Sequence, residues 1–90
     1  MTTLDDALVA YIWKPGSSIP GKHPGAIADS AARVEVEAVI AELDAIRPDA
    51  DAADLMPWAD RKAREIAAAH PDIGDSGTRA LRDLLSWTWR

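Results

Sequence analysis

The chain has 90 residues, a formal net charge of −5 and no cysteine. This length fits one domain with a thin core, because a chain so short keeps roughly 40% of its unfolded surface exposed after folding. It excludes a Rossmann enzyme, a TIM barrel or a kinase acting alone. The missing cysteine excludes a disulfide framework, a cysteine-based zinc site and a thiol nucleophile. The negative charge argues against a protein that coats nucleic acid or an anionic membrane.

Composition and patterning also indicate where the protein works. No apolar run approaches the ~20 residues that span a bilayer. Asp5 and Asp6 stand where the charge pattern of a signal peptide would begin. We therefore expect a soluble, cytoplasmic protein with no membrane partner. Alanine fills 18 positions, arginine outnumbers lysine 7 to 3, and asparagine and glutamine are absent, which predicts a source in a high-GC bacterium, its phage or its plasmid.

The first predicted helix covers about residues 4–13. Thr3 stands where it can cap this helix, and the acidic residues after it suit the positive end of the helix dipole. The apolar residues recur at helical spacing, as Leu4, Leu8, Tyr11 and Ile12. The continuous apolar run over residues 8–13 also fits a strand, but the spacing and the cap favour a helix.

A loop rich in proline and glycine follows at residues 14–25. It contains three Pro-Gly pairs, each of which can form a tight turn, so we expect a shaped loop and not a floppy tether. Residues 16–22 also match the spacing G-x-x-x-x-G-K of a phosphate-binding loop. Pro20 removes an N–H that such a loop needs, and 90 residues leave no room for the parallel sheet. We therefore interpret the segment as a connector.

A long central helix is predicted over about residues 26–46. Its apolar stripe consists of Ala28, Ala32, Val36, Val39, Ile40, Leu43 and Ile46. Pro48 ends the helix, because the residue before a proline avoids the α region. An acidic linker at 49–54 follows, in which Asp54 can cap the next helix.

Two further helices complete the predicted fold. One covers about residues 55–70, with the stripe Leu55, Ala59, Ala63, Ile66 and Ala67. The other runs from about residue 76 to the C-terminus, is capped by Asp75 or Ser76, and has the stripe Leu81, Leu84, Leu85 and Thr88. The sequence thus predicts one all-α domain over residues 1–90, a compact four-helix bundle-like fold.

The residue types needed for catalysis are not arranged for it. His23 and His70, the two histidines, have no zinc-binding spacing to one another or to an acidic neighbour. The serines lie outside any G-x-S-x-G frame, and no carboxylate pair stands out from the surface charge. We therefore expect no enzymatic activity, no cofactor and no metal.

Residues 65–82 resemble the two central helices of a helix-turn-helix or winged-helix domain. The residues that carry the resemblance are Ile66, Ala67, Ile73, Gly74, Thr78, Leu81 and Leu85. It covers about a quarter of the chain. The resemblance implies a DNA-binding regulator that uses the helix at 76–89, with Thr78, Arg79 and Arg82 on the side that faces the groove. The alternative interpretation of these residues is an ordinary αα-hairpin.

Tryptophan is the remaining functional signal, with four residues in a chain that has no phenylalanine. Tryptophan is enriched at interaction hot spots, and the ends of helices are hard places to bury it. We therefore predict that Trp13, Trp87 and Trp89 bind a partner, although the tryptophans could instead be the large fillers of the core. Residues 25–56 carry a net charge of −6 (2 basic and 8 acidic side chains), which favours a basic partner surface.

The preferred function is accordingly a non-enzymatic protein–protein interaction module, working as a small regulator, inhibitor or adaptor. Its partner is a protein, and a second copy of the chain is one candidate. DNA binding by the helix at 76–89 is the alternative. The acidic segment 25–56 argues against it, since this segment would repel a polyanion.

Overall fold

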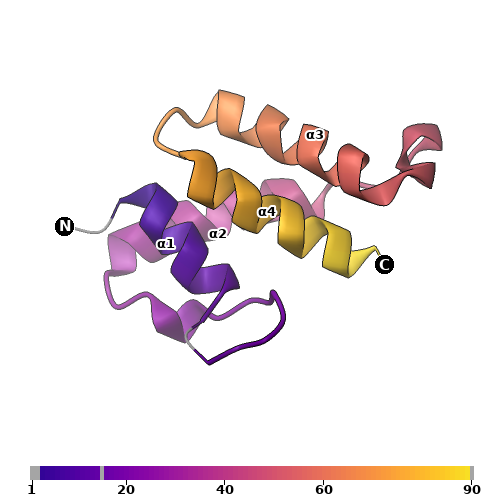
Figure 1. Cartoon of the computed structure of the whole chain (residues 1–90). Helices are drawn as coiled ribbons and strands as arrows, with labels where there is room; N and C mark the ends of the chain where they lie inside the picture. The colour runs from indigo at the N-terminus through magenta and orange to yellow at the C-terminus, as the bar shows by residue number, and fades with distance from the viewer. Residues whose placement is uncertain (1–2, 15, 90) are drawn as a thin grey trace.

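The computed structural model of the chain describes residues 3–14 and 16–89, and this part of the protein is all-α, without a strand. The helices are α1 (Leu4–Ile12), α2 (Ser30–Asp44), α3 (Leu55–Ala69) and α4 (Asp75–Thr88), with short 3-10 helices at Pro24–Ala26 and Ala50–Ala53 (Figure 1). The prediction of a compact, all-α, four-helix fold is confirmed.

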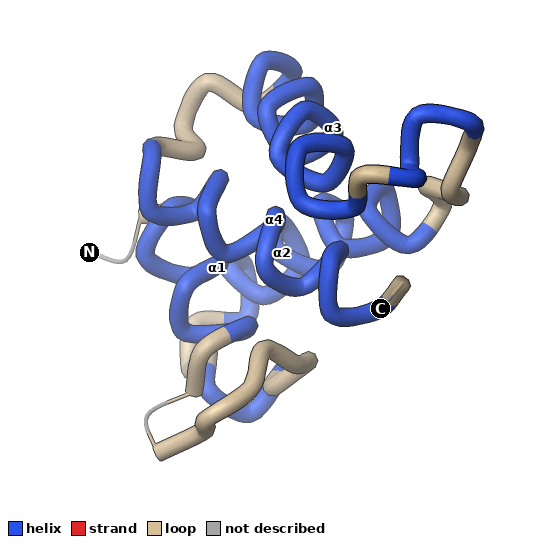
Figure 2. The backbone as a smooth tube through the Cα atoms, turned by 45° about the vertical axis from the view of Figure 1, so that its right-hand side comes forward, coloured by secondary structure: helices blue, strands red, loops and turns tan. Residues whose placement is uncertain are grey.

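The helices pack around α4, which lies in the middle of the molecule (Figure 1). α3 lies beside α4 and runs in the opposite direction, so that the start of α3 and the end of α4 are on the same side of the molecule (Figures 1 and 2). α1 packs against both α4 and α2. The site described below lies where α1 and α4 meet.

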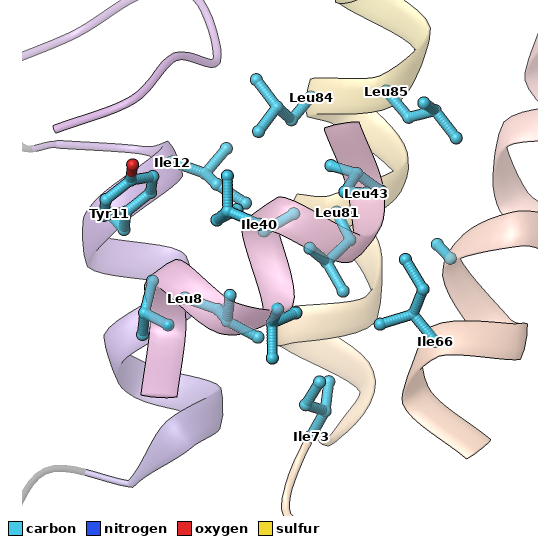
Figure 3. Close-up of a cluster of buried hydrophobic side chains, with 14 of the residues drawn as sticks. Leu8, Tyr11, Ile12, Ile40, Leu43, Ile66, Ile73, Leu81, Leu84 and Leu85 are labelled. Carbon is cyan, nitrogen blue, oxygen red and sulfur yellow. The ribbon is translucent and has the colours of Figure 1, made fainter. Parts of the chain in front are cut away.

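The core between the helices is formed by apolar side chains alone, as far as the described residues go. All four helices contribute to it, and Figure 3 shows leucine and isoleucine side chains from each of them directed into one cluster. Trp58 of α3 is the largest residue in this cluster and is fully buried. The predicted stripe of α3 omitted Trp58, although it lies one turn from Leu55.

α1 begins where the sequence predicts. The Thr3 hydroxyl oxygen accepts a hydrogen bond from the Asp6 amide at 3.0 Å, and Ala7, Leu8, Tyr11 and Ile12 are buried on one face. Burial on a single helical face is what separates this segment from a strand, whose side chains alternate between two faces. The prediction of a helix is confirmed, and the strand interpretation of residues 8–13 is wrong.

α2 is shorter than predicted, because it begins at Ser30 and not near residue 26, and it ends at Asp44, before Ile46 and Pro48. Asp29 is extended, and its carboxylate accepts hydrogen bonds from the amides of Ala31 (2.9 Å) and Ala32 (3.4 Å). This N-cap satisfies amide groups that would otherwise lack a partner. Ala28 consequently lies outside the helix and is exposed, so it does not belong to the core stripe.

The cap of α4 comes from a distant part of the chain, and the prediction that Asp75 or Ser76 caps it is wrong. Gly74 occupies the N-cap position without a side-chain cap, while both predicted residues lie in the first turn of the helix. Oδ1 of Asp5, on α1, instead accepts hydrogen bonds from the amides of Gly74 (2.8 Å) and Gly77 (2.6 Å). Asp5 therefore ties the start of α1 to the start of α4.

The predicted cap of α3 also differs from the structure. Asp54 occupies the N-cap position, but its side chain makes no capping hydrogen bond. The acidic linker before it includes the 3-10 helix at Ala50–Ala53, so part of the segment 49–54 is a helical turn and not an irregular linker.

The loop after α1 is shaped, as its composition predicts. The Gly21 amide donates to the Ile12 carbonyl at 3.0 Å, and the His23 amide donates to the Tyr11 carbonyl at 2.9 Å. The loop thereby folds back over the end of α1. Among the glycines only Gly16 has a positive φ, of 89°. The last pair, Pro24-Gly25, forms part of a 3-10 helix.

Candidate functional site: a groove between α1 and α4

A hollow of about 340 Å³ opens where the end of α1, the following loop and the end of α4 meet. We call it the Trp groove, and it is lined by Trp13, Ser18, Ile19, Pro20, Met56, Asp83, Ser86 and Trp87. Five large apolar side chains are exposed on the described part of the molecule, and three of them line this groove: Ile19 (46% exposed), Met56 (48%) and Trp87 (39%). The exposed apolar surface is thus concentrated rather than scattered.

Local structure accounts for each wall of the Trp groove. Trp13 is the C-cap of α1, and its amide donates to the Val9 carbonyl at 2.7 Å. The wall formed by the loop is held by the Ser17 hydroxyl, which donates to the Ile19 carbonyl at 2.8 Å, and by the buried Pro20. Met56 comes from the first turn of α3 and Trp87 from the last turn of α4.

A smaller hollow of about 160 Å³ adjoins the Trp groove. It is lined by Val9, Trp13, Ser76, Arg79, Ala80 and Asp83. Trp13 and Asp83 line both hollows, so the depression continues along α4 towards its first turns. Arg82 donates to Oδ1 of Asp83 through Nε (3.2 Å) and Nη2 (2.9 Å). A half-buried carboxylate therefore lies between the apolar pocket and Arg79.

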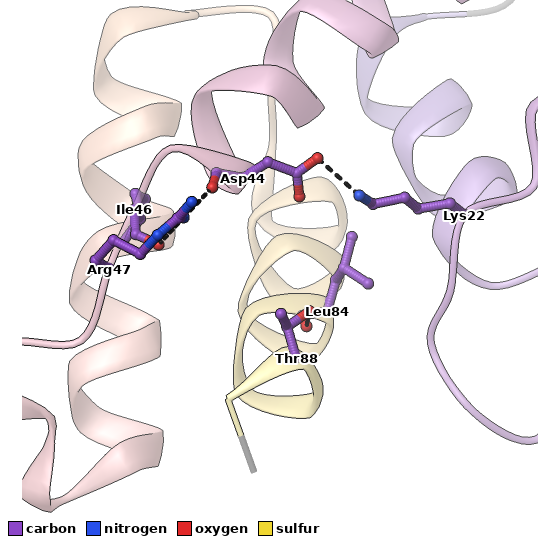
Figure 4. A network of polar contacts seen from close by, with 6 residues as sticks. All are labelled: Lys22, Asp44, Ile46, Arg47, Leu84 and Thr88. Atoms are coloured by element: carbon purple, nitrogen blue, oxygen red, sulfur yellow. Dashed lines mark hydrogen bonds and ion pairs between the residues drawn. The ribbon is translucent and has the colours of Figure 1, made fainter.

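Trp89 lies away from the Trp groove, over the end of α2. The Arg47 guanidinium carbon is 5.6 Å from the centroid of the Trp89 ring, which is within the range of a cation–π contact. Arg47 is itself held by the carbonyls of Asp44 and Ile46, and the Asp44 carboxylate forms an ion pair with Lys22 at 2.7 Å (Figure 4). Trp89 thus has a partner within the chain.

The predicted binding residues therefore divide into two groups. Trp13 and Trp87 meet in the Trp groove, and Trp89 lies at a separate hollow with Arg47. Successive side chains on a helix are about 100° apart. Trp87, in the last turn of α4, and Trp89, its C-cap, therefore point in directions that differ by about 200°. The sequence analysis did not predict that Ile19 and Met56 belong to the site. The sequence does contain an indication, because each is a large apolar residue outside the predicted helical stripes.

The residues predicted to contact DNA lie together in another hollow, of about 440 Å³, between α3 and α4, and Arg79 also lines the smaller hollow beside the Trp groove. Thr78, Arg79 and Arg82 line it together with Asp60, Arg64, Ala67 and Asp75. Arg64 forms an ion pair with Asp60 at 2.9 Å, and Arg82 is paired with Asp83. The antiparallel α3 and α4 form an αα-hairpin, the alternative interpretation of this segment (Figure 1).

The two histidines lie in separate parts of the molecule. His70 is the C-cap of α3, and its Nε2 lies 2.5 Å from a carboxylate oxygen of Glu42 on α2. His23 lies in the loop, with Nε2 buried and without a hydrogen-bond partner. The residues that the structure describes contain no group of three or more metal-binding side chains.

The fold alters the acidity of Tyr11, a buried residue of α1. Burial raises the pKa of its hydroxyl above 10.0, and the carboxylates of Glu37 and Asp44 act in the same direction. The ammonium group of Lys22 opposes them. The neutral hydroxyl is therefore favoured in the folded protein.

Comparison with known proteins identifies no relative of the chain. No protein-family model matches it, and no curated protein or solved structure is significantly similar to it. Among the described residues, no helix combines the length and the apolar character needed to cross a membrane. The site is therefore interpreted from its own geometry and chemistry.

Proposed function

We propose that this protein is a small, non-enzymatic protein-interaction module that binds its partner in the Trp groove. The observation that carries the proposal is the convergence of Ile19, Met56 and Trp87 with Trp13 on one hollow. These residues come from three distant segments of the chain, and grouped exposed apolar side chains mark interaction sites. Such a module would act as a regulator, inhibitor or adaptor, by occluding a partner's surface or by recruiting the partner.

The charge of the chain favours a partner with a basic surface. Residues 25–56 carry a net charge of −6, and α2 presents exposed Glu35, Glu37 and Glu42 along its length. A field of one sign raises the rate at which an oppositely charged partner associates, whereas the affinity resides in the apolar contacts. The acidic helix would thus attract the partner, and the Trp groove would retain it.

A capture experiment with groove variants tests the proposal. The protein would be immobilised and exposed to lysate of a high-GC bacterium. The affinity of each captured protein would then be measured for the parent and for the variants Trp87→Ala and Met56→Ser. Val34→Ser is the matched control, because Val34 is also exposed and apolar (67% exposed) but lies on α2, outside the groove. Circular dichroism would first establish that each variant is folded.

We expect a captured protein to bind Val34→Ser as it binds the parent. Trp87→Ala should weaken its binding by about 2 kcal/mol or more, as is usual for a tryptophan hot spot. A partner that binds both groove variants as tightly as the parent would contradict the proposal.

DNA binding is the second candidate function. The observation in its favour is that Arg64, Arg79 and Arg82 converge on the hollow between α3 and α4. It ranks second because residues 25–56, with a net charge of −6, would repel a polyanion. A gel shift with duplex DNA tests it. Retardation that rising salt weakens steeply and that Arg79→Ala abolishes would support DNA binding over the Trp groove. We expect no such retardation near physiological salt.

A further inference from the structure

The groove surface presents three kinds of chemistry in a fixed order along α4. Arg79, Asp83 and Trp87 follow one another at intervals of four residues, which is about 6 Å along a helix. Asp83 lines both hollows, with Arg79 on the one side and Trp87 on the other. The order is therefore positive, negative and apolar.

Both charged groups in this series have hydrogen-bonding capacity left for a partner. Arg82 donates only to Oδ1 of Asp83, and Oδ2 accepts no hydrogen bond from the described residues. Arg79 forms no ion pair within the part of the chain that the structure describes. The Asp83 side chain is only 27% exposed, and salt screens such a half-buried charge less than a surface charge.

We infer that the segment that fills this groove is a helix of the partner protein with three side chains at one-turn spacing: a large apolar residue, then a lysine or arginine, then an aspartate or glutamate. The apolar residue enters the pocket beside Trp87, the cation pairs with Asp83, and the carboxylate pairs with Arg79. This inference rests on the proposed function and specifies the chemistry of its partner.

A helix suits the groove better than an extended segment does. The groove is bordered by helices, whose backbone groups are bonded within each helix, so an extended peptide would find no sheet edge to satisfy its own amides and carbonyls. A helix satisfies its backbone internally, and its residues at i, i+4 and i+8 repeat the spacing of Arg79, Asp83 and Trp87.

A second copy of the chain does not offer this pattern. The exposed large apolar residues in the α-helices that the structure describes are Val34, Met56 and Trp87. Each has an acidic residue one turn away, in the order Glu37, Asp60 and Asp83. A second copy would thus bring a carboxylate to Asp83, where a cation is needed. The occupant is therefore a different protein.

A helical peptide library tests the inference directly. The probe is a displayed, alanine-based 16-residue helix with random residues at positions 4, 8 and 12, selected on the folded parent protein. Peptides that also bind Trp87→Ala would be discarded. In the surviving peptides, positions 4, 8 and 12 should carry an apolar, a basic and an acidic residue, either in this order or in the reverse order. Both orders are allowed because a helix can lie in either direction along the groove.

Charge variants then separate the inference from the proposed function. Asp83→Asn should weaken the selected peptides by roughly fivefold, as expected for a partly exposed ion pair. Asp44→Asn is the control: it removes the same charge from a carboxylate that is likewise paired with a cation, Lys22, but lies outside both hollows of the groove. It should leave their binding unchanged.

The possible outcomes are distinguishable. Peptides that require Trp87 but show no preference for a cation, or that bind Asp83→Asn as tightly as the parent, would overturn the inference and leave the proposed function standing. A selection in which no peptide depends on Trp87 would overturn both.

Discussion

The two ends of the α1–α4 interface differ in how closely the helices approach. At the first end Asp5 caps α4, and a Cβ atom at Gly77 would lie 2.5 Å from Oδ1 of Asp5. At the second end Trp13, Asp83 and Trp87 border an open groove. One pair of helices thus has a closed end without room for a methyl group and an open end with room for a partner's side chain.

Under the proposed function, this difference separates stability from binding along one interface. Backbone contact at the closed end fixes the position of α1 on α4, while bulky side chains at the open end leave apolar surface uncovered. Uncovered apolar surface lowers the stability of a thin domain, so it persists more readily where another part of the interface compensates. The closed end provides such compensation.

The largest effect is expected between the two ends, at Leu81. This residue is fully buried on α4, and Leu81→Ala should lower the free energy of unfolding by about 2–5 kcal/mol through lost burial and the cavity left behind. Urea denaturation followed by circular dichroism measures this change. A variant as stable as the parent would show that α4 is not the centre of the core.

Gly77→Ala tests the closed end. Alanine favours a helix over glycine by up to ~1 kcal/mol, yet here its Cβ would meet Oδ1 of Asp5 at 2.5 Å and Cγ2 of Ile73 at 3.1 Å. We expect a net loss of about 1–3 kcal/mol in the same denaturation assay. Gly25→Ala is the control, because nothing lies within 4 Å of a Cβ built there. A stabilised Gly77→Ala would mean that the helices do not touch at this point.

Asp5→Ala should cost about 1–2 kcal/mol, because it removes the cap from the amides of Gly74 and Gly77. It also removes the oxygen atom that the new methyl group of Gly77→Ala would meet. The double variant should therefore lose less stability than the sum of the two single variants. Strict additivity in this double-mutant cycle would contradict a direct contact between Asp5 and Gly77.

The sequence predicted what depends on neighbours along the chain and missed what depends on contacts between distant segments. The positions of the four helices, the Thr3 cap and the shaped loop follow from local patterns. The start of α2 was also readable, because Asp29 precedes Ser30 as a typical cap, but the continuing apolar spacing obscured it. The cap that Asp5 provides to Gly77 joins residues 72 positions apart, and no local pattern encodes it.

The candidate site was predicted in part for the same reason. The position of Trp13 and Trp87 at helix ends indicated exposure, and the structure brings both to one groove. The sequence could not show that Ile19 would join them from a loop, nor that Arg47 would cover Trp89. Both depend on how the loop and the end of α2 pack against α4.

At the open end, substitution should leave stability nearly unchanged. Met56 is 48% exposed in the first turn of α3, so Met56→Ser should alter the free energy of unfolding by no more than about 0.5 kcal/mol. Thermal denaturation measures the change, and Leu81→Ala serves as the destabilised reference. A loss comparable to that of Leu81→Ala would mean that the groove is part of the core and not a binding surface.

The smallest effect concerns Tyr11, a buried residue of α1 whose carbonyl is hydrogen-bonded to the loop that forms one wall of the open end. Because burial raises the pKa of its hydroxyl above 10.0, the folded state favours the neutral form. The contribution of this preference is fully present below pH 10.0 and is lost as the pH rises through the folded-state pKa. Tyr11→Phe should therefore match the parent near neutral pH and lose less stability than the parent in alkali. Urea titrations at pH 7 and above pH 10.0 compare the two proteins. Parallel losses in both would indicate that the Tyr11 hydroxyl is solvated in the folded protein.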